Sequence, residues 1–229
     1  MSIPYTLLRY ATIGTLALVV LFVFYALASA PSREASRLGM KGLKRQRALE
    51  QNEGWAQLEP LVRWLGVRVS GILSEAQRAS IDKRLGLAGD WLGITPDEFV
   101  ALSIVSFFGG LRFGAVFGAI SGMGFSMLFA VGPVGAALPY LQVQGEAERR
   151  AKAINRGLPY AIDLLALSMS AGKDFPGAVR QVVEKSSDPD DPLVEELARI
   201  LQELSIGRTR RQALLSFAER CPSETVLEF

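Results

Sequence analysis

The sequence predicts an all-α membrane protein with three transmembrane helices and a cytoplasmic helical bundle. Apolar residues make up 49% of the chain and mean hydropathy is +0.24, yet 21% of the residues are charged. The apolar and charged residues are separated along the chain, so long uncharged runs alternate with amphipathic stretches. The runs are long enough to cross a bilayer, and the stretches between them place apolar residues at helical spacing.

The first uncharged run covers residues 11–30, which is 20 residues and matches the thickness of a bilayer core. A cluster of basic residues follows it: Arg33, Arg37, Lys41, Lys44, Arg45 and Arg47. By the positive-inside rule, residues 1–30 are an anchor with its N-terminus outside, and the chain enters the cytoplasm at residue 31. A signal peptide is the alternative, but its basic residues would precede the apolar run. This basic cluster either only sets the orientation of the chain in the membrane, or also contacts anionic lipid.

Residues 31–96 are expected to form a cytoplasmic helical region. Trp55, Leu58, Val62, Leu65, Val69 and Ile72 recur at helical spacing. Pro60 either begins this helix or bends it. Its apolar face packs on a neighbouring helix or lies on the membrane surface.

Residues 97–144 are expected to form a transmembrane hairpin. The run Thr95-Pro96-Asp97-Glu98 is a strong helix start, and from Phe99 to Gln144 the only charge is Arg112. We expect spans near residues 97–118 and 121–142, with the turn between 118 and 124. Arg112 would then lie toward the outer end and snorkel, or it would serve an ion path or a subunit contact. Basic residues appear again at 149–156, so by the positive-inside rule the chain is in the cytoplasm there.

Residues 145–229 are expected to form a cytoplasmic bundle around a helix at 159–171. Pro159 suits its first turn, Gly172 suits the position just past its end, and Leu158, Ile162, Leu165 and Met169 form an apolar stripe. Further helices are expected from about 176 to 185, from Pro192 to Ser205 after a cap at Asp191, and after a cap at Thr209. Ser223 would cap a last helix that is unfinished at Phe229, so we expect this domain, and the chain, to continue.

This bundle resembles the type II secretion system F domain family. The residues that carry the resemblance are Leu158-Pro159, Ile162-Asp163-Leu164-Leu165-Ala166, Ala171-Gly172, Pro176, Ala178-Val179, Glu203-Leu204, Gly207, Ala213-Leu214 and Phe217-Ala218-Glu219-Arg220. Within the family the chain looks most like the platform proteins of the Tad (tight adherence) pilus. The resemblance implies a multi-pass protein of the bacterial inner membrane that works as a scaffold. Its implied partners are a cytoplasmic hexameric secretion ATPase, a paralogous platform protein and pilin subunits, besides the lipid bilayer, in a homo- or hetero-oligomer.

The sequence contains no pattern typical of catalysis or of cofactor binding. There is no histidine, which removes the commonest general base and metal ligand, and no phosphate loop or dinucleotide fingerprint. Asp188, Asp190 and Asp191 lack the spacing of a calcium loop, and Cys221 has no histidine to activate it. A net charge of +2 gives no argument for nucleic acid. We therefore expect no catalytic, cofactor or metal site, and a protein that is not an enzyme.

The candidate site is instead a partner interface on the cytoplasmic bundle. Asp163 is the one charge in an apolar helix, so it either pairs with an arginine such as Arg180 or Arg220, or contacts a partner. Charged turns supply the other candidates: Lys173, Asp174, Glu203, Gly207, Arg208, Arg210 and Arg211. A small-solute transporter or channel subunit is the alternative function. Its apolar runs lack Asp, Glu and His, but Pro133 and Pro139 would offer a helix break.

Overall fold

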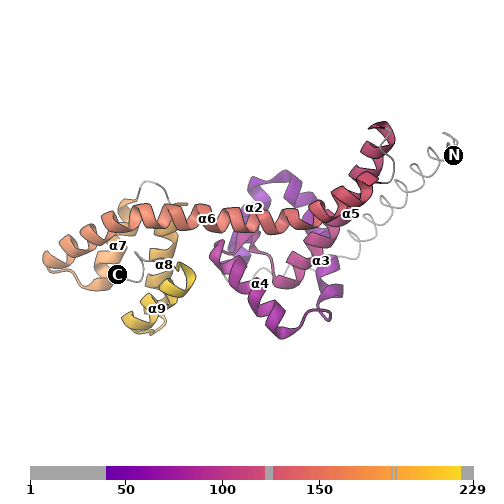
Figure 1. Ribbon diagram of the computed structural model, residues 1–229. Helices are drawn as coiled ribbons and strands as arrows, with labels where there is room; N and C mark the ends of the chain where they lie inside the picture. The colour runs from indigo at the N-terminus through magenta and orange to yellow at the C-terminus, as the bar shows by residue number, and fades with distance from the viewer. Residues whose placement is uncertain (1–39, 122–125, 187, 189, 223–229) are drawn as a thin grey trace, which may run out of the picture. The chain divides into compact units, whose positions relative to one another are not determined.

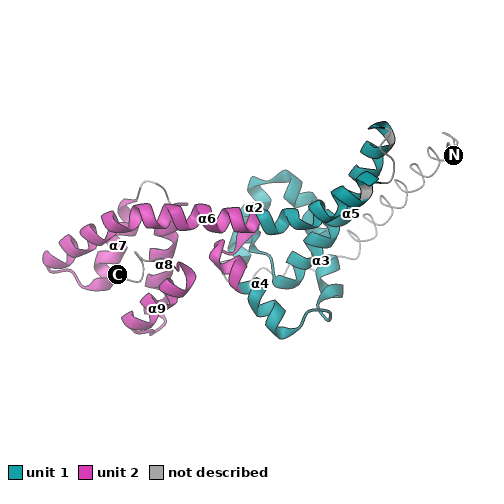
Figure 2. Ribbon diagram, in the orientation of Figure 1, with its two compact units in different colours: residues 1–82, 92–141 teal, residues 83–91, 142–229 magenta. Residues whose placement is uncertain are grey.

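The computed structural model describes residues 40–121, 126–186, 188 and 190–222, and its regular structure in these ranges is helical throughout. The chain divides into two compact units, one made of residues 1–82 and 92–141 and the other of residues 83–91 and 142–229 (Figure 2). The predicted all-α class is confirmed for the described residues. The predicted anchor at 11–30 and the predicted last helix from Ser223 lie outside them.

The first unit contains α2 (Met40–Gln51), α3 (Glu53–Val69), most of α4 (Glu75–Leu87), α5 (Pro96–Ser121) and the beginning of α6 (Ser126–Ser170) (Figure 1). Two of its helices start with capping boxes, of which the one at Thr95–Glu98 was predicted. The Gln77 side chain accepts from the Ser74 N–H, and the Glu98 side chain accepts from the Thr95 N–H. Pro60 lies inside α3, which begins earlier, after the cap Asn52.

α3 and α5 pack closely because a glycine stands at their contact. A Cβ built on Gly66 would lie 2.9 Å from Glu98 Cγ, so only glycine permits this approach. A few turns along, Leu61 and Trp64 are buried with Val105 packed against them. The base of α5 is therefore covered by α3.

α5 and α6 pair in opposite directions, again through glycine. A Cβ on Gly110 would lie 2.8 Å from the Val131 carbonyl oxygen, and a Cβ on Gly132 would lie 2.6 Å from Leu111 Cδ2. α5 and α6 pair as a hairpin would, residues 122–125 between them lie outside the described residues, and insertion of this pair in a membrane stays a prediction. Among the described residues, only Pro96–Gly118 passes as long and apolar enough to cross a membrane, by length and composition alone, and 17% of its most apolar window is buried.

The second unit holds the rest of α6 with α7 (Phe175–Lys185), α8 (Pro192–Ser205) and α9 (Arg210–Arg220). Its core is apolar: Ile154, Leu158, Ala161, Leu165, Phe175, Ala178, Val179, Leu193, Leu197, Ile200, Ala213, Phe217 and Cys221. The predicted caps Asp191 and Thr209 are confirmed, since their side chains accept from the N–H groups of Leu193 and Gln212. Gly172 and Gly207 follow helix ends with φ of +92° and +90°.

The predicted helix start at Pro159 is wrong. α6 runs without a break from Ser126 to Ser170 and passes through Pro133, Pro139 and Pro159. Ile154, Leu158, Ala161 and Leu165 form one buried stripe on both sides of Pro159, which is itself exposed. Burial of this stripe holds the helix together where the missing N–H of proline would otherwise favour a start.

Candidate functional site

A chain of ion pairs joins α6, α8 and α9 in the second unit. The Arg150 guanidinium on α6 donates to the carboxylates of Glu195 and Glu196 on α8, both at 2.7 Å. From α9, Arg220 donates to Glu196 and to Glu203, both at 2.9 Å. Arg208 completes the chain by donating to Glu203 at 3.1 Å. We call these six residues the bundle network.

The two buried arginines of the bundle network, Arg150 and Arg220, stay charged over the working pH range. Burial by itself lowers the pKa of Arg150, but the adjacent carboxylates of Glu195 and Glu196 outweigh it and raise the pKa above its ordinary value. The pKa of Arg220 is raised in the same way against burial, by Glu196 and Glu203. Arg150 and Arg220 are therefore permanent cations that contact carboxylates on α8 from two other helices.

Cys221 lies at the end of α9 beside this network. Burial, and after it the negative charge of Glu196, raise the pKa of its thiol to about 12. The thiolate, which is the nucleophile, is therefore scarce near neutral pH. This agrees with a packing role for Cys221.

The predicted pairing of Asp163 with Arg220 or Arg180 is wrong. Asp163 is exposed on α6, away from the buried stripe that contains Leu158, Ala161 and Leu165. The Arg220 guanidinium is engaged by Glu196 and Glu203 instead. Asp163 therefore remains a candidate for contact with a partner.

Glu203 was predicted to be an exposed partner contact, but its side chain is buried. Its side chain is 11% exposed and lies between Arg208 and Arg220. The sequence suggested an exposed charged turn, but the exposed residues begin at Ser205, two positions after Glu203. Glu203 therefore positions Arg208 from within the bundle and does not itself reach a partner.

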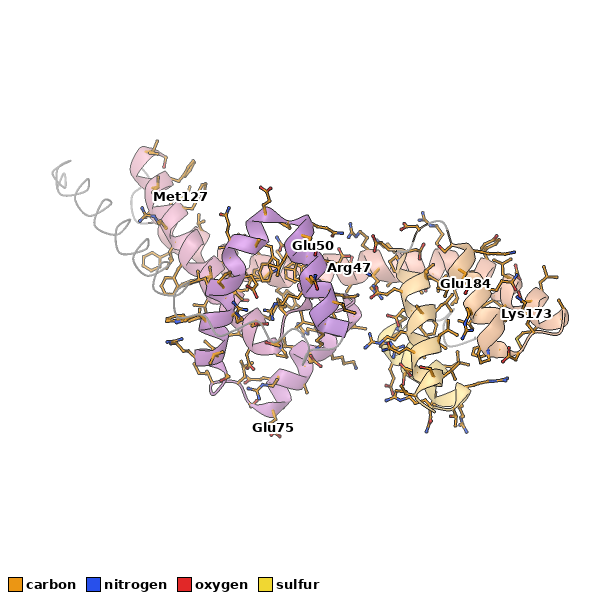
Figure 3. All side chains as sticks on the ribbon, turned by 180° about the vertical axis from the view of Figure 1, so that it is seen from behind. Arg47, Glu50, Glu75, Met127, Lys173 and Glu184 are labelled. Atoms are coloured by element: carbon orange, nitrogen blue, oxygen red, sulfur yellow. The ribbon has the colours of Figure 1, made fainter. Side chains whose placement is uncertain are left out.

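The remaining charged candidates gather at one end of the bundle. The Arg210 guanidinium lies 5.5 Å from the centre of the Phe175 ring, so the start of α9 lies beside the start of α7. Asp174 caps α7 by accepting from the Gly177 N–H, and Lys173 is exposed at the preceding turn (Figure 3). We call the exposed residues at this end the basic surface: Lys173, Ile206, Arg208, Arg210 and Arg211. Asp163 has no contact that joins it to this surface.

Two arginines of the basic surface lie where the helix dipole opposes a positive charge. Arg210 and Arg211 occupy the first turn of α9, which contains no acidic residue. Cations there oppose the helix dipole, at about 0.3–1 kcal/mol each. Ile206, which ends α8 just before this turn, is 71% exposed. Such a surface is suited to a partner that offers carboxylates and an apolar contact.

The first unit contains a second set of buried charges, which the sequence analysis missed. Arg45 on α2 pairs with Glu98 on α5, and its Nε lies 3.2 Å from Glu59 Oε1 on α3. Arg63 Nη1 lies 3.6 Å from the same oxygen. We call these four residues the base network. Arg45 had been counted among the basic residues that set topology, whereas here it is buried.

Comparison of the chain with family models, with curated proteins and with solved structures finds no match. Within the described ranges, no group of three His, Cys, Asp or Glu residues is arranged to hold a metal ion. The basic surface is thus the candidate site that the geometry supports best.

Proposed function

We propose that the chain is an inner-membrane platform protein of a Tad or related type II secretion machine, which couples a cytoplasmic hexameric ATPase to pilin assembly. In this proposal residues 11–30, α5 and the first part of α6 cross the membrane, with the N-terminus in the periplasm. The protein is a non-catalytic scaffold, and the ATPase supplies the hydrolysis.

The observation that carries the proposal is α6. One continuous helix contributes residues both to the apolar pair with α5 and to the bundle tied by Arg150, Glu196 and Arg220. A scaffold that transmits force to a membrane needs an ordered element shared by the two parts. The resemblance of the bundle to the secretion F domain supports the same function.

The basic surface is the proposed docking site for the motor or for a paralogous platform subunit. Arg210 and Arg211 are exposed and make no contribution to the bundle network, so their charge is available to a partner. Mechanical coupling requires such a contact on the side of the protein that faces the cytoplasm.

The test is charge reversal on this surface. Arg211→Glu should abolish filament formation and weaken co-purification with the ATPase, while membrane insertion and protein level stay unchanged. Lys185→Glu is the matched control, because Lys185 is also exposed but lies at the other end of α7, roughly 15 Å away along the helix. Normal filaments in the Arg211→Glu strain would argue against docking at this surface.

The transporter alternative loses the feature that favoured it. Pro133 and Pro139 lie inside the continuous helix α6 and do not mark a break. No described polar cluster lies within the apolar pair to take its place, so we do not develop that function further.

A further inference from the structure

Between α4 and α5 the chain passes from the second unit to the first through residues 89–93, which have an unusual backbone. Positive φ occurs at four of them: Gly89 (+72°), Asp90 (+57°), Leu92 (+54°) and Gly93 (+62°). Aspartate is tolerated in this left-handed region, but a bulky residue such as Leu92 is an outlier there. Such a backbone persists only where its surroundings hold it in place. We call residues 89–93 the crossing segment.

The first end of the crossing segment is fixed within the second unit. The Asp90 N–H donates to the Leu85 carbonyl at 2.8 Å, which closes α4 with Gly89 as its left-handed residue. The Arg150 guanidinium of the bundle network lies against Gly89, because a Cβ there would be 2.5 Å from Nη1 and 2.7 Å from Cζ. Asp90 is buried and lies 3.6 Å from Arg199 on α8. A side chain at position 89 would therefore displace Arg150.

The second end of the crossing segment is fixed within the first unit, against α2. Gly93 is buried, and a Cβ on it would overlap the Lys41 carbonyl oxygen and lie 2.7 Å from the Arg45 amide nitrogen. Backbone meets backbone at this point, so neither side can yield by changing a rotamer. Arg45 is the residue of the base network that pairs with Glu98. The crossing segment thus contacts one arginine of each charge network.

The left-handed backbone gives the crossing segment two arrangements. While both ends are held, Asp90 and Leu92 stay in a region of φ that costs free energy. When one end is released, these two residues can relax to ordinary negative φ. That relaxation changes the direction of the chain and pulls the other end from its place. A segment that is seated at both ends or at neither is the kind of two-state element that couples distant sites.

We propose that the crossing segment couples the two networks, so that a displacement of Arg150 in the bundle network reaches α2 and Arg45 in the base network. This coupling acts within the chain and does not depend on the proposed function, because none of its residues belongs to the apolar pair or to the basic surface. In a scaffold that transmits force, it supplies a second path beside α6.

The test displaces Arg150 and follows hydrogen–deuterium exchange of the α2 amides in the purified full chain. Gly89→Ala places a methyl group where the Arg150 guanidinium lies, and it should speed exchange in α2 about fivefold or more, besides loosening α8. Gly207→Ala is the matched control, because Gly207 has φ of +90° in the same unit and a Cβ there meets nothing within 4 Å. It adds left-handed strain without touching Arg150, so α2 should exchange as in the unmodified chain. Equal α2 exchange in the two variants would contradict the coupling.

A second variant separates the crossing segment from α6, which also runs through both units. Insertion of two glycines between Trp91 and Leu92 lengthens the segment and leaves the contacts of Gly89 and Gly93 in place. In this background Gly89→Ala should still loosen α8 but no longer change α2. The same insertion after Gly71, in the turn between α3 and α4, is the control and should preserve the α2 effect. An α2 effect that survives the insertion at Trp91 would mean that the signal travels along α6, and it would overturn the proposal.

Arg150→Lys decides the question if Gly89→Ala does not fold. Lysine keeps a positive charge beside Glu195 and Glu196, but it has no planar group to lie against Gly89. Faster α2 exchange in Arg150→Lys that disappears with the insertion at Trp91 supports the coupling. Unchanged α2 exchange in this variant contradicts it.

Discussion

The two buried networks use the same residue types with very different geometry. In the bundle network, Glu196 is 2% exposed and each of its oxygens accepts a hydrogen bond from an arginine at 2.7–2.9 Å. In the base network, Glu59 is fully buried, its nearest guanidinium nitrogens lie at 3.2 and 3.6 Å, and neither oxygen meets hydrogen-bond geometry. Burial and opposite charge alone therefore do not make a strong tie, because alignment is needed as well.

The largest expected effect is that of Glu196→Met. Removing this carboxylate leaves Arg150 and Arg220 buried with half of their partners, which should cost about 3–5 kcal/mol of the free energy of unfolding. Urea unfolding of the detergent-solubilised chain measures it. A loss below about 1 kcal/mol would show that the aligned hydrogen bonds add nothing.

Glu59→Met is the matched change in the base network. Arg45 keeps Glu98 as a partner, and Arg63 loses only a carboxylate at 3.6 Å that accepts no hydrogen bond from it. We expect a loss of about 1–2 kcal/mol or less, since an apolar side chain of similar volume replaces an unsatisfied carboxylate. The same urea assay serves, and a loss as large as that of Glu196→Met would erase the distinction between the networks.

The pH dependence of stability due to Cys221 tests whether water reaches the thiol beside the bundle network. Its pKa is about 12 in the folded chain against an ordinary 9.0, so the unfolded chain releases this proton first as the pH rises. Its contribution to stability is thus complete below pH 9.0 and is lost between 9.0 and about 12, at up to about 1.4 kcal/mol per pH unit. Subtracting the stability curve of Cys221→Ala isolates this slope. Identical slopes in the two chains would mean that the thiol is hydrated.

The smallest effect is expected for Arg208→Ala, at the exposed end of the bundle network. Its side chain is 51% exposed and its pair with Glu203 at 3.1 Å is screened by water. Removal should cost less than about 1 kcal/mol. Filament formation is the second measurement, because Arg208 also belongs to the basic surface.

The sequence predicted the helix ends better than the buried charges. Asp191, Thr209 and the Thr95–Glu98 box were identified because a cap depends on residues two or three positions apart. Glu196 and Arg220 are 24 residues apart and Arg45 and Glu98 are 53 apart, so no local pattern joins them. The helix start predicted at Pro159 is wrong for a related reason, since burial of Leu158 and Ala161 overrides a local start signal.

Asp163 and Glu203 show the same limit within the candidate site. Asp163 was the one charge in an apolar helix and Glu203 was placed in an exposed charged turn, and helical spacing alone did not decide which one turned inward. Asp163 faces solvent, while Glu203 lies between two arginines supplied by the turn after α8 and by α9. The clustering of Lys173 with Arg210 depends on the packing of α7 against α9, which only the fold provides.

The order of synthesis adds a consequence to the bundle network. Arg150 and Glu196 leave the ribosome before Arg220, and the 24 residues between Glu196 and Arg220 take about 1–5 s to translate. During that interval Glu196 has Arg150 as its cation but still lacks the one from α9. The Glu196 carboxylate on α8 therefore stays without one of its two arginine partners until α9 has been synthesised.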